Sequence, residues 1–436
     1  MTVIRRSKDS TDETLATRGP GADSGGAAAG PRPGSLGAAL RHQPFRRVWL
    51  GQLASNTGTW MQNIVLGVLA YELTGEAWFI GVITFAQLGP MLLLSPVGGA
   101  VADRIDRRVL MIGIAVTQTV LSLALAAVTL HAQPNRVAIV GLVFLIGAGS
   151  ALYGPAAAAT LPALVGRRDL QGAVALNSAA MNASRVAGPI LGGAVAAVGG
   201  PSLVFVVNAA SFLFVVWAVG TVRADFSPKG LAGEGPLQQL REGVRAARAD
   251  RVLTRVLVTI SVFSLCSLVF IYQMPFIATT RLGIEGVAYT LLFAGFALGA
   301  ALGALSMGSV FAGVARSRMS RGALVLFAAA LTTFGLTTSP WVAYPAVFVT
   351  GAAYFVVVTA LSTTMQMRVD DTVRGRVMGL WMMGWAGLVP VGGLVAGPVI
   401  DHVGVVPVLL FGAAVALVLG LAVDLREPDL EAVGGA

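Results

Sequence analysis

Charge and cysteine are scarce in this chain. Only 12% of its 436 residues are charged, whereas a typical soluble protein carries about 25%. The single cysteine, Cys266, excludes an internal disulfide and a cysteine-based metal cluster. The three histidines, His42, His131 and His402, lie far apart without metal-ligand spacing. We therefore expect no bound metal and no cofactor.

Two further absences narrow the function. The sequence has no glycine-rich loop of the kind that holds nucleotide phosphates, so ATP is not the expected energy source. It has no constellation of nucleophile and base, so we expect no enzyme. Stretches that interleave aromatic and basic residues are missing too. The net charge of +9 therefore does not indicate a nucleic-acid partner.

Most of what remains is apolar. Hydrophobic residues make up 56% of the chain, and the mean hydropathy is +0.78. They come in runs of about 20, the length of helix that crosses a bilayer core, and they do not alternate with polar residues as in a membrane barrel. The sequence predicts an all-α polytopic membrane protein with twelve spans. We expect them at residues 47–73, 77–102, 109–130, 137–165, 170–197, 201–222, 252–280, 286–312, 320–338, 341–367, 373–400 and 404–424.

One connection between the predicted spans is much longer than the others. It covers residues 223–251, carries charged, glycine and proline residues, and ends in a segment typical of a short amphipathic helix. It divides the spans into six and six. We expect a disordered tail 1–42 without the apolar core of a signal peptide, an N-terminal half 43–222, the linker, a C-terminal half 252–425 and a tail 426–436.

The basic residues are distributed unevenly across the predicted membrane. With the N-terminus inside, 27 of the 30 lysine and arginine residues fall in the tails, the linker and the inner loops. Only Arg136 and Arg281 fall outside, and Arg185 falls within a span. This is the positive-inside pattern of membrane proteins. It predicts a membrane protein with an even number of spans and both termini in the cytoplasm.

The two predicted halves resemble each other. The segments that begin near residues 170 and 373 each enter the fifth span of a half from a basic loop. Each then carries a proline and a pair of glycines. The pairs Gly192–Gly193 and Gly392–Gly393 lie 200 positions apart. An internal duplication of six spans is typical of transporters whose halves rock around a central site.

Two motifs resemble those of the major facilitator superfamily. The run from Gly99 to Arg108, GAVADRIDRR, resembles the superfamily signature of the loop between spans two and three, with Asp106 in place of a second glycine. The run Ala187–Gly193, AGPILGG, resembles the fifth-span motif of its exporters. This resemblance implies a fold of two pseudo-symmetric six-helix halves and a transport function.

Three further runs narrow the resemblance. Residues 155–162 (PAAAATLP), 208–212 (NAASF) and 374–379 (RGRVMG), with the form DRIDRR in the first motif, resemble the branch that contains enterobactin exporters and macrolide-efflux-like proteins. This implies export of a catecholate siderophore or a macrolide-like compound. The resemblance extends over about residues 42–425 and carries little information on substrate identity.

The first motif predicts a conformational latch at the inner face. Asp103 lies at the end of span two, and span eleven begins near Val373 on the same side. Free N–H groups and the helix dipole favour an anion at a helix N-terminus. We expect Asp103 to bind there when the inner side is closed, and Gly99 to allow the close approach.

The arginines of this motif have two interpretations. Arg107 and Arg108 can pair with Asp370 or Asp371, just ahead of span eleven. Alternatively, they and Arg104 set the topology or hold anionic lipid headgroups. The extra acid, Asp106, either offsets one arginine or caps the helix that starts beside it.

The fifth span carries an interruption and a charge. Pro189 removes a backbone hydrogen bond, while Gly188, Gly192 and Gly193 permit close helix contact. We expect these four residues to shape a moving interface, although packing alone also explains the glycines. Arg185 precedes the bend, and an intramembrane arginine faces a cavity or a partner. It suits an anionic substrate or charge balance, unless it extends to the membrane surface.

Polar and aromatic residues recur within the spans. Gln52, Asn56, Thr59 and Asn63 lie on one face of the first span. In the superfamily fold these spans surround a central cavity, and amide, hydroxyl and aromatic groups suit an amphipathic molecule. Hydrogen bonding between helices is the competing interpretation. The predicted cavity residues are Asn56, Thr59, Asn63, Gln87, Asn182, Arg185, Tyr272, Gln273, Tyr354, Trp381 and Trp385.

No carboxylate falls at the middle of a predicted span. The candidates for proton coupling, Glu72, Asp401 and His402, all lie at outer ends. Proton antiport is therefore implied only by the resemblance. We expect a monomeric secondary exporter of an amphipathic small molecule that works by alternating access. An importer of a small metabolite, or a membrane sensor on the same scaffold, remains an alternative.

Overall fold

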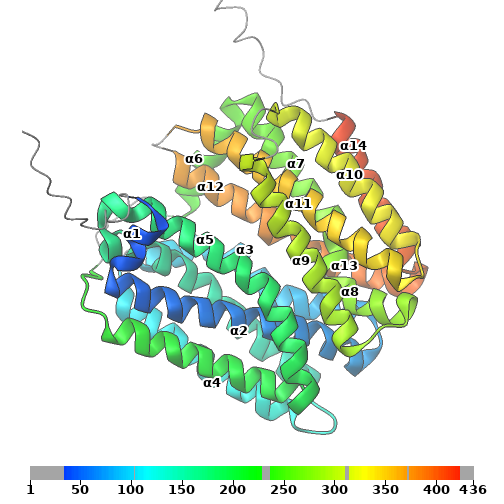
Figure 1. Cartoon of the computed structure of the whole chain (residues 1–436), viewed down its shortest axis with the longest axis horizontal. Coiled ribbons are helices and arrows are strands. Elements are labelled where there is room, and N and C mark those ends of the chain that lie inside the picture. Colours follow the sequence, from blue (N-terminus) through cyan, green and yellow to red (C-terminus); the bar gives the residue numbers. More distant parts are fainter. Residues whose placement is uncertain (1–33, 103, 228–235, 310–313, 371–372, 423–436) are drawn as a thin grey trace, which may run out of the picture.

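The computed structural model describes residues 34–102, 104–227, 236–309, 314–370 and 373–422, and these ranges contain helices and no strand (Figure 1). The first part of the chain forms α1 (Leu36–Arg41), α2 (Gln43–Thr74), α3 (Ala77–Ala102), α4 (Arg107–Thr129) and α5 (Arg136–Thr221). The second part forms α6 (Pro236–Ala249), α7 (Arg251–Ser267), α8 (Val269–Ile277), η1 (Ala278–Leu282), α9 (Gly286–Ser309), α10 (Arg316–Leu336), α11 (Pro340–Arg368), α12 (Arg374–Met382), η2 (Met383–Gly387), α13 (Leu388–Val403) and α14 (Val405–Ala422).

Helix α5 is three membrane spans joined by sharp turns. It is 86 residues long, but its backbone leaves the helical region at Gly166 (φ 71°) and again at Gly199 and Gly200 (φ 68°). Positive φ is accessible to glycine because it has no Cβ. Pro201 follows at once and starts the next helical segment. The resulting segments, 136–165, 167–198 and 201–221, agree with the fourth to sixth predicted spans.

Twelve spans follow from this description. Nine described stretches are long and apolar enough to cross a membrane, and α5 is one of them although it contains three spans. Helices α7, α8 and η1 together form the seventh span, and α12, η2 and α13 form the eleventh. Helix α2 is the first span; it is 32 residues long and carries the polar stripe. The all-α fold with twelve spans is confirmed.

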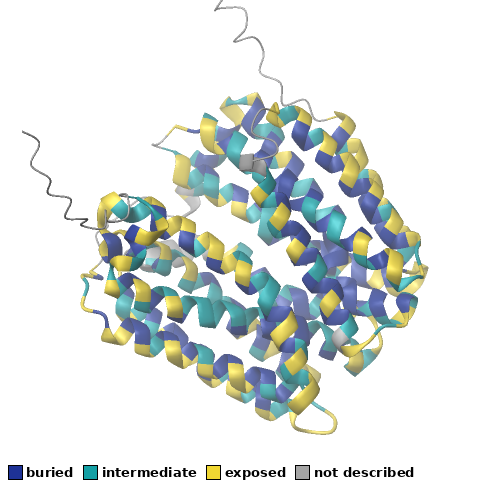
Figure 2. Ribbon diagram, viewed as in Figure 1, coloured by how far each residue is buried: buried dark blue, intermediate teal, exposed yellow. Residues whose placement is uncertain are grey.

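The spans form two groups. Helices α2 to α5 pack against one another, as do α7 to α14 (Figure 1). Each group has its own apolar core, which includes Phe205 and Leu125 in the first and Phe263, Phe270 and Phe327 in the second. Buried residues lie inside each group and exposed ones on its outer surface (Figure 2). The exposed residues include large apolar ones, as expected where lipid replaces water.

The predicted tail is shorter than expected. Residues 36–41 form α1, whereas the composition predicted disorder up to residue 42. The reason is a set of contacts that composition does not reveal. Ser35 caps the helix through the N–H of Ala38, and Asp169 accepts hydrogen bonds from Gly34 N (3.0 Å) and pairs with His42 Nε2 (2.9 Å). The remainder of both predicted tails, 1–33 and 426–436, lies outside the described residues.

The linker contains the short helix that the sequence predicts. Helix α6 packs against α12, and Glu242 forms an ion pair with Arg376. Asp250 then caps α7 and pairs with Arg368 at the end of α11 (2.9 Å). Burial raises the pKa of the Asp250 carboxyl, but hydrogen bonds from Arg368 and from two backbone N–H groups outweigh it and hold that pKa below its ordinary value.

Candidate functional site

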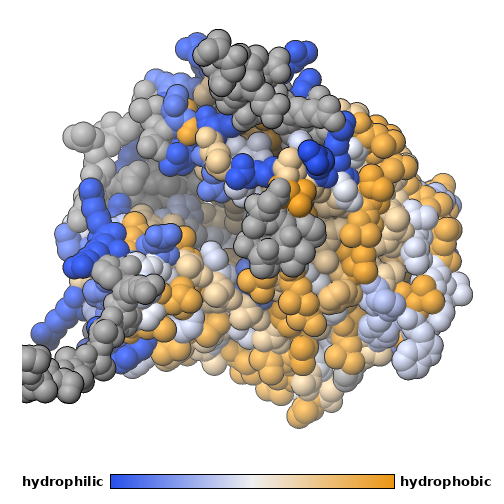
Figure 3. Space-filling model, turned by 45° about the horizontal axis from the view of Figure 1, so that its top comes forward, coloured by the Kyte–Doolittle hydropathy of each residue, from blue (hydrophilic) through white to orange (hydrophobic). Residues whose placement is uncertain are grey.

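The two groups of helices contact each other at one end of the bundle. We call the end that carries Arg104 and Arg374 the basic end, and the end that carries Thr74 and Val403 the opposite end. The groups converge toward α8 and α13 and diverge toward α1 and α12 (Figure 1). The space-filling view shows a hollow between them with hydrophilic residues on its rim (Figure 3). The molecule is therefore closed at the opposite end and open at the basic end.

Asp401 holds the opposite end together. Its carboxylate lies at the end of α13 and accepts hydrogen bonds from the backbone N–H groups of Ala77 (2.7 Å) and Trp78 (2.9 Å), which begin α3 in the other half. These N–H groups have no partner within their own helix, and the helix dipole favours an anion there. Gln273 of α8 donates to the Ala77 carbonyl (3.1 Å). Two side chains of the C-terminal half thus bind one helix start of the N-terminal half.

Next to the contact of Asp401 with the start of α3, glycines allow the backbones of α3 and α13 to touch. A Cβ on Gly81 would lie 2.5 Å from the Gly393 carbonyl oxygen. A Cβ on Gly397 would lie 2.6 Å from the Cα of Trp78. Since real Cβ contacts do not come this close, any side chain at Gly81 or Gly397 would force the helices apart.

The two glycine pairs occupy equivalent positions in the two halves. A Cβ on Gly192 would meet Met61 of the first span (3.0 Å), and one on Gly392 would meet Leu265 of the seventh span (2.1 Å). The second member of each pair lies between the halves, where Gly193 faces Thr290 of α9 and Gly393 faces Gly81. Each pair therefore packs its span against the first span of its own half and the second span of the other half.

The rest of the fifth-span motif fits the first span. Gly188 is buried against Trp60, whose Cβ would lie 2.4 Å from a Cβ at Gly188. Pro189 is buried as well. Ser184, one turn earlier, lies 3.0 Å from the Thr57 hydroxyl. The motif thus holds the fifth span close to α2. A role in movement stays a prediction.

A small cavity lies where the halves meet. It has a volume of about 20 Å³, and residues of α2, α3, α8 and α9 surround it. Trp60, Asn63 and Gln87 line it from the N-terminal half, and Tyr272 lines it from the C-terminal half. Gln87 donates a hydrogen bond to Asn63. This cavity has room for about one water molecule. It is therefore the narrow end of the hollow between the halves.

Arg185 lies beside this cavity between two aromatic rings from different halves. Its guanidinium carbon is 5.2 Å from the ring centre of Trp60 and 5.0 Å from that of Phe355 in α11. Tyr272 and Tyr354 are near enough to interact electrostatically with its charge. These distances are typical of cation–π contacts.

Trp385 and Tyr354 are joined in the same region. The indole N–H of Trp385 donates to the Tyr354 hydroxyl oxygen (2.8 Å). Of the predicted cavity residues, Asn63, Gln87, Arg185, Tyr272, Tyr354 and Trp385 are thus brought together. That they bind a substrate stays a prediction.

The other predicted cavity residues lie elsewhere in this structure. Gln273 is 1% exposed and its amide is held at Ala77, while Trp381 is 2% exposed and packs in the C-terminal core. Trp381 is therefore part of the core of its half, and Gln273 is part of the contact between the halves. Asn182 donates to the carbonyl of Ser178 in its own helix (3.1 Å). Asn56 and Thr59 are half-buried on α2.

Two features were missed by sequence reasoning. Trp60 and Phe355 flank Arg185, but an apolar ring in an apolar span gives no signal of its own. Gln62 was passed over although it neighbours Asn63. It is buried and accepts hydrogen bonds from Asn208 (2.8 Å) and Ser122 (3.4 Å). This network joins α2, α4 and α5 and holds the N-terminal half together.

Residues 106–108 of the basic loop contact the N-terminal half and the start of the linker. Asp106 caps α4 through the N–H groups of Arg108 (2.8 Å) and Val109 (3.2 Å), one of the two roles expected for it. Arg107 donates to the Ala159 carbonyl (3.2 Å). Arg108 donates to the carbonyl of Ala224 (3.3 Å).

The predicted latch is tested only in part by these residues. Gly99 lies near the end of α3, and Arg104 and Asp370 are exposed. Asp103 and Asp371 lie outside the described residues. The docking of Asp103 and the pairing of Arg107 or Arg108 with Asp370 or Asp371 therefore stay predictions.

The candidates for proton coupling cluster at the opposite end. Glu72 is exposed near the end of α2. Asp401 bridges the halves, and the adjacent His402 donates from Nδ1 to the Pro398 carbonyl (2.8 Å). Among the described residues, no group of three metal-binding side chains is present.

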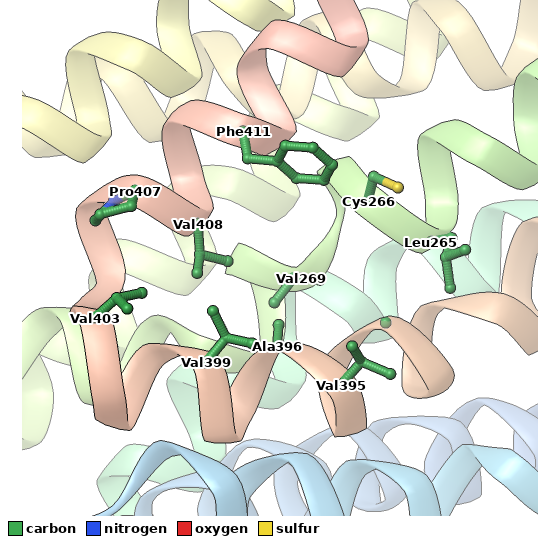
Figure 4. A pocket seen from close by; sticks show the side chains of 11 residues that line it. Leu265, Cys266, Val269, Val395, Ala396, Val399, Val403, Pro407, Val408 and Phe411 are labelled. Carbon is green, nitrogen blue, oxygen red and sulfur yellow. The ribbon is translucent and has the colours of Figure 1, made fainter.

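An apolar groove lies entirely within the C-terminal half. Residues of α7, α8, α13 and α14 line its volume of about 370 Å³, among them Cys266, Val399 and Phe411 (Figure 4). It is larger than the central cavity. No residue of the N-terminal half lines it, so movement of the halves cannot open it alternately to the two sides.

The fold and the site together define a multi-pass membrane transporter of the major facilitator superfamily. The model of one family of this superfamily, described as "transmembrane secretion effector", matches residues 34–433. The chain belongs to this family. It is 26% identical over 349 residues to the enterobactin exporter EntS of Escherichia coli O1:K1 / APEC, with 78% of this chain and 81% of the relative covered.

Solved structures share the fold. The nucleoside transporter NupG superimposes with a TM-score of 0.68 at 15% identity, over 87% of this chain and 98% of that one. A bacterial homologue of the human lysosomal transporter Spinster, solved in an inward-facing, unoccupied conformation, gives a TM-score of 0.64 at 16% identity, over 87% and 93%. At these identities the likeness shows the fold alone.

Proposed function

We propose that this protein is a secondary active exporter that carries an amphipathic small molecule by alternating access. The observation that carries the proposal is the cavity between the halves. Amide, hydroxyl and aromatic groups line it, and the Arg185 guanidinium lies against the ring of Trp60 in its wall. Asp401 and the Gly81–Gly393 contact close it at one end. A site between two halves that touch at one end is the arrangement that rocking transporters use.

Export is the direction that the relatives and the motif favour. The relative named above is an enterobactin exporter, and the Gly188–Pro189 motif resembles that of exporters. A catecholate siderophore or a macrolide-like compound is the substrate class that we propose. We infer that the basic end is cytoplasmic. Both termini then lie in the cytoplasm, the protein acts as a monomer in the bacterial cytoplasmic membrane, and the structure is open inward.

Protons are the coupling ion that we propose. Asp401 is the strongest of the three candidates, because protonating its carboxylate would remove the charge that holds α3 to α13. Glu72 and His402 lie at the same end. In everted vesicles the cytoplasmic face is outward, so an exporter carries substrate into the lumen and proton antiport removes protons from it. The proposal predicts that the lumen becomes more alkaline in step with substrate uptake, and that Asp401→Asn uncouples the two.

Two measurements test the function. Metabolites in the medium of deletion and wild-type cells would identify a compound that only the wild type releases. Counterflow of that compound in vesicles containing the purified protein would then establish transport. Gly81→Ala should reduce counterflow, while Gly113→Ala, whose Cβ would meet no atom within 4 Å, should not. Absence of counterflow in the natural protein would contradict the proposal and favour a sensor.

A further inference from the structure

We propose that Arg185 is a binding site for an anionic group carried on an aromatic part of the transported molecule. This inference rests on the proposed function, because it takes the central cavity to be the transport site. It names the chemical class of substrate more narrowly, since a neutral macrocycle and a cationic drug are both excluded as preferred ligands.

The charge of Arg185 has no acidic partner in the described part of the protein. Its Nε atom is buried without a hydrogen-bond partner. The described carboxylates all lie in loops, in the linker or at span ends: Glu72, Glu76, Asp106, Asp169, Asp225, Glu242, Asp250, Glu285, Asp370 and Asp401. A cation inside a membrane protein is costly unless an opposite charge or dipoles compensate it. An incoming anion can supply that charge.

The walls around Arg185 fit a flat ring. Trp60 and Phe355 hold the guanidinium between their rings at 5.2 and 5.0 Å. Such rings stabilise a cation only in part, and an aromatic ligand can pack against the ring surface that the guanidinium leaves uncovered. The planar guanidinium has paired N–H donors that match the two oxygens of a carboxylate or a catecholate.

A second donor converges on the same place. The Tyr354 hydroxyl oxygen accepts a hydrogen bond from the N–H of Trp385. The hydroxyl proton of Tyr354 can therefore be donated to another group. Tyr272, which lines the cavity, also carries a hydroxyl and is near enough to interact electrostatically with the Arg185 charge. One cation and two hydroxyls surround the site, and none of them is an anion. The site is therefore selective for negative charge.

The position of Arg185 also connects the ligand to both halves. Trp60 belongs to α2 and Phe355 to α11, so the guanidinium contacts one ring from each half. A ligand that pairs with Arg185 and stacks on these rings would touch both halves at once. It would lower the cost of moving the charge through the membrane.

A pair of probes of equal shape tests the inference. The full-length protein in lipid nanodiscs is titrated with 2-naphthoate and with 2-naphthamide, which share one ring system and differ in that an anionic carboxylate is replaced by a neutral amide. Binding is measured by calorimetry. We expect naphthoate to bind at least tenfold more tightly. Equal or tighter binding of naphthamide, or no binding of naphthoate, would overturn the inference without any variant.

Variants show whether Arg185 causes the preference for naphthoate. Arg185→Gln should bring the two affinities within twofold of each other, and Arg185→Lys should keep a preference for naphthoate. The matched control is Arg281→Gln, which lies at the opposite end and should leave the tenfold preference intact. A preference that survives in Arg185→Gln would place the anion elsewhere. The counterflow experiment tests transport separately. A preference for naphthoate without counterflow would contradict the proposed transport function but would still support an anion-binding site at Arg185.

Discussion

In the sequence, Asp103 comes directly after the last residue of α3, while Asp401 lies near the end of α13. Asp401 ends α13 and binds the first N–H groups of α3, and Asp103 follows α3 and is predicted to bind the start of the span at Arg374. If the predicted contact of Asp103 forms, each acid binds the N-terminus of the span that carries the other. Because the halves cannot close at both ends at once, only one of the two contacts should form in each conformation.

Asp401→Asn should weaken the closed opposite end. A carboxylate at a helix N-terminus contributes about 0.3–2 kcal/mol, so the equilibrium should shift severalfold toward the state open at that end. With Cys266→Ser and Gln87→Cys in place, a membrane-impermeant maleimide added at the opposite end should label position 87 faster. Glu285→Gln, a nearby exposed acid, serves as control. An unchanged labelling rate for Asp401→Asn would contradict the role given to it.

Asp250 should make stability depend on pH. Its pKa lies below the ordinary value of about 3.9. Its contacts therefore stabilise the fold fully above that value and less as pH falls through the lower folded pKa. Asp250→Asn should lower the midpoint of thermal aggregation at pH 7, and the difference from the natural protein should shrink below about pH 4. A difference that grows on acidification would mean that the ion pair with Arg368 is not the cause.

The sequence predicts single residues best where their surroundings are local. The cap by Asp106 depends on its immediate neighbours and was among the expected roles. The burial of Gln273 and Trp381 depends on how distant spans pack, so a polar or aromatic residue in a span cannot reveal which way it faces. Arg185 could be recognised because its charge is costly in a membrane, but the rings beside it could not.

Among the helices, α3 and α13 form the main contact between the halves. Glycine makes this contact possible, and the equivalent pairs in α5 and α13 each serve one contact within a half and one between halves. Helix boundaries followed from the apolar runs, and the structure places one of them at Gly200 and Pro201. Helix α1 could not be predicted in this way, because its stability comes from Asp169, more than a hundred positions away.

Gly81→Ala should disturb this helix contact. The added Cβ would come within 2.5 Å of the Gly393 carbonyl, whereas the Cβ of Gly113→Ala would meet nothing within 4 Å. We expect Gly81→Ala to favour the state open at the opposite end and to raise maleimide labelling of position 87, as Asp401→Asn does. Gly113→Ala should behave like the natural protein. Equal labelling of both variants would show that the close approach of α3 and α13 is dispensable.

For the whole molecule, the two groups of helices form bodies with separate cores that are joined at one end. Composition and repeats predicted two halves, but they could not predict which end is closed. That choice depends on the balance between the contacts at the opposite end and those predicted for the basic end, and one sequence encodes both. The structure presents the state that Asp401 and the α3–α13 glycines stabilise.

The central claim is that the two ends open and close reciprocally. Distances between spin labels test it most directly, in a Cys266→Ser background. One protein carries labels at Arg168 and Met367, at the basic end, and another at Gln133 and Thr338, at the opposite end; all four side chains are exposed. Adding Asp401→Asn should shorten the first distance and lengthen the second. Two distances that change in the same direction, or not at all, would contradict alternating access.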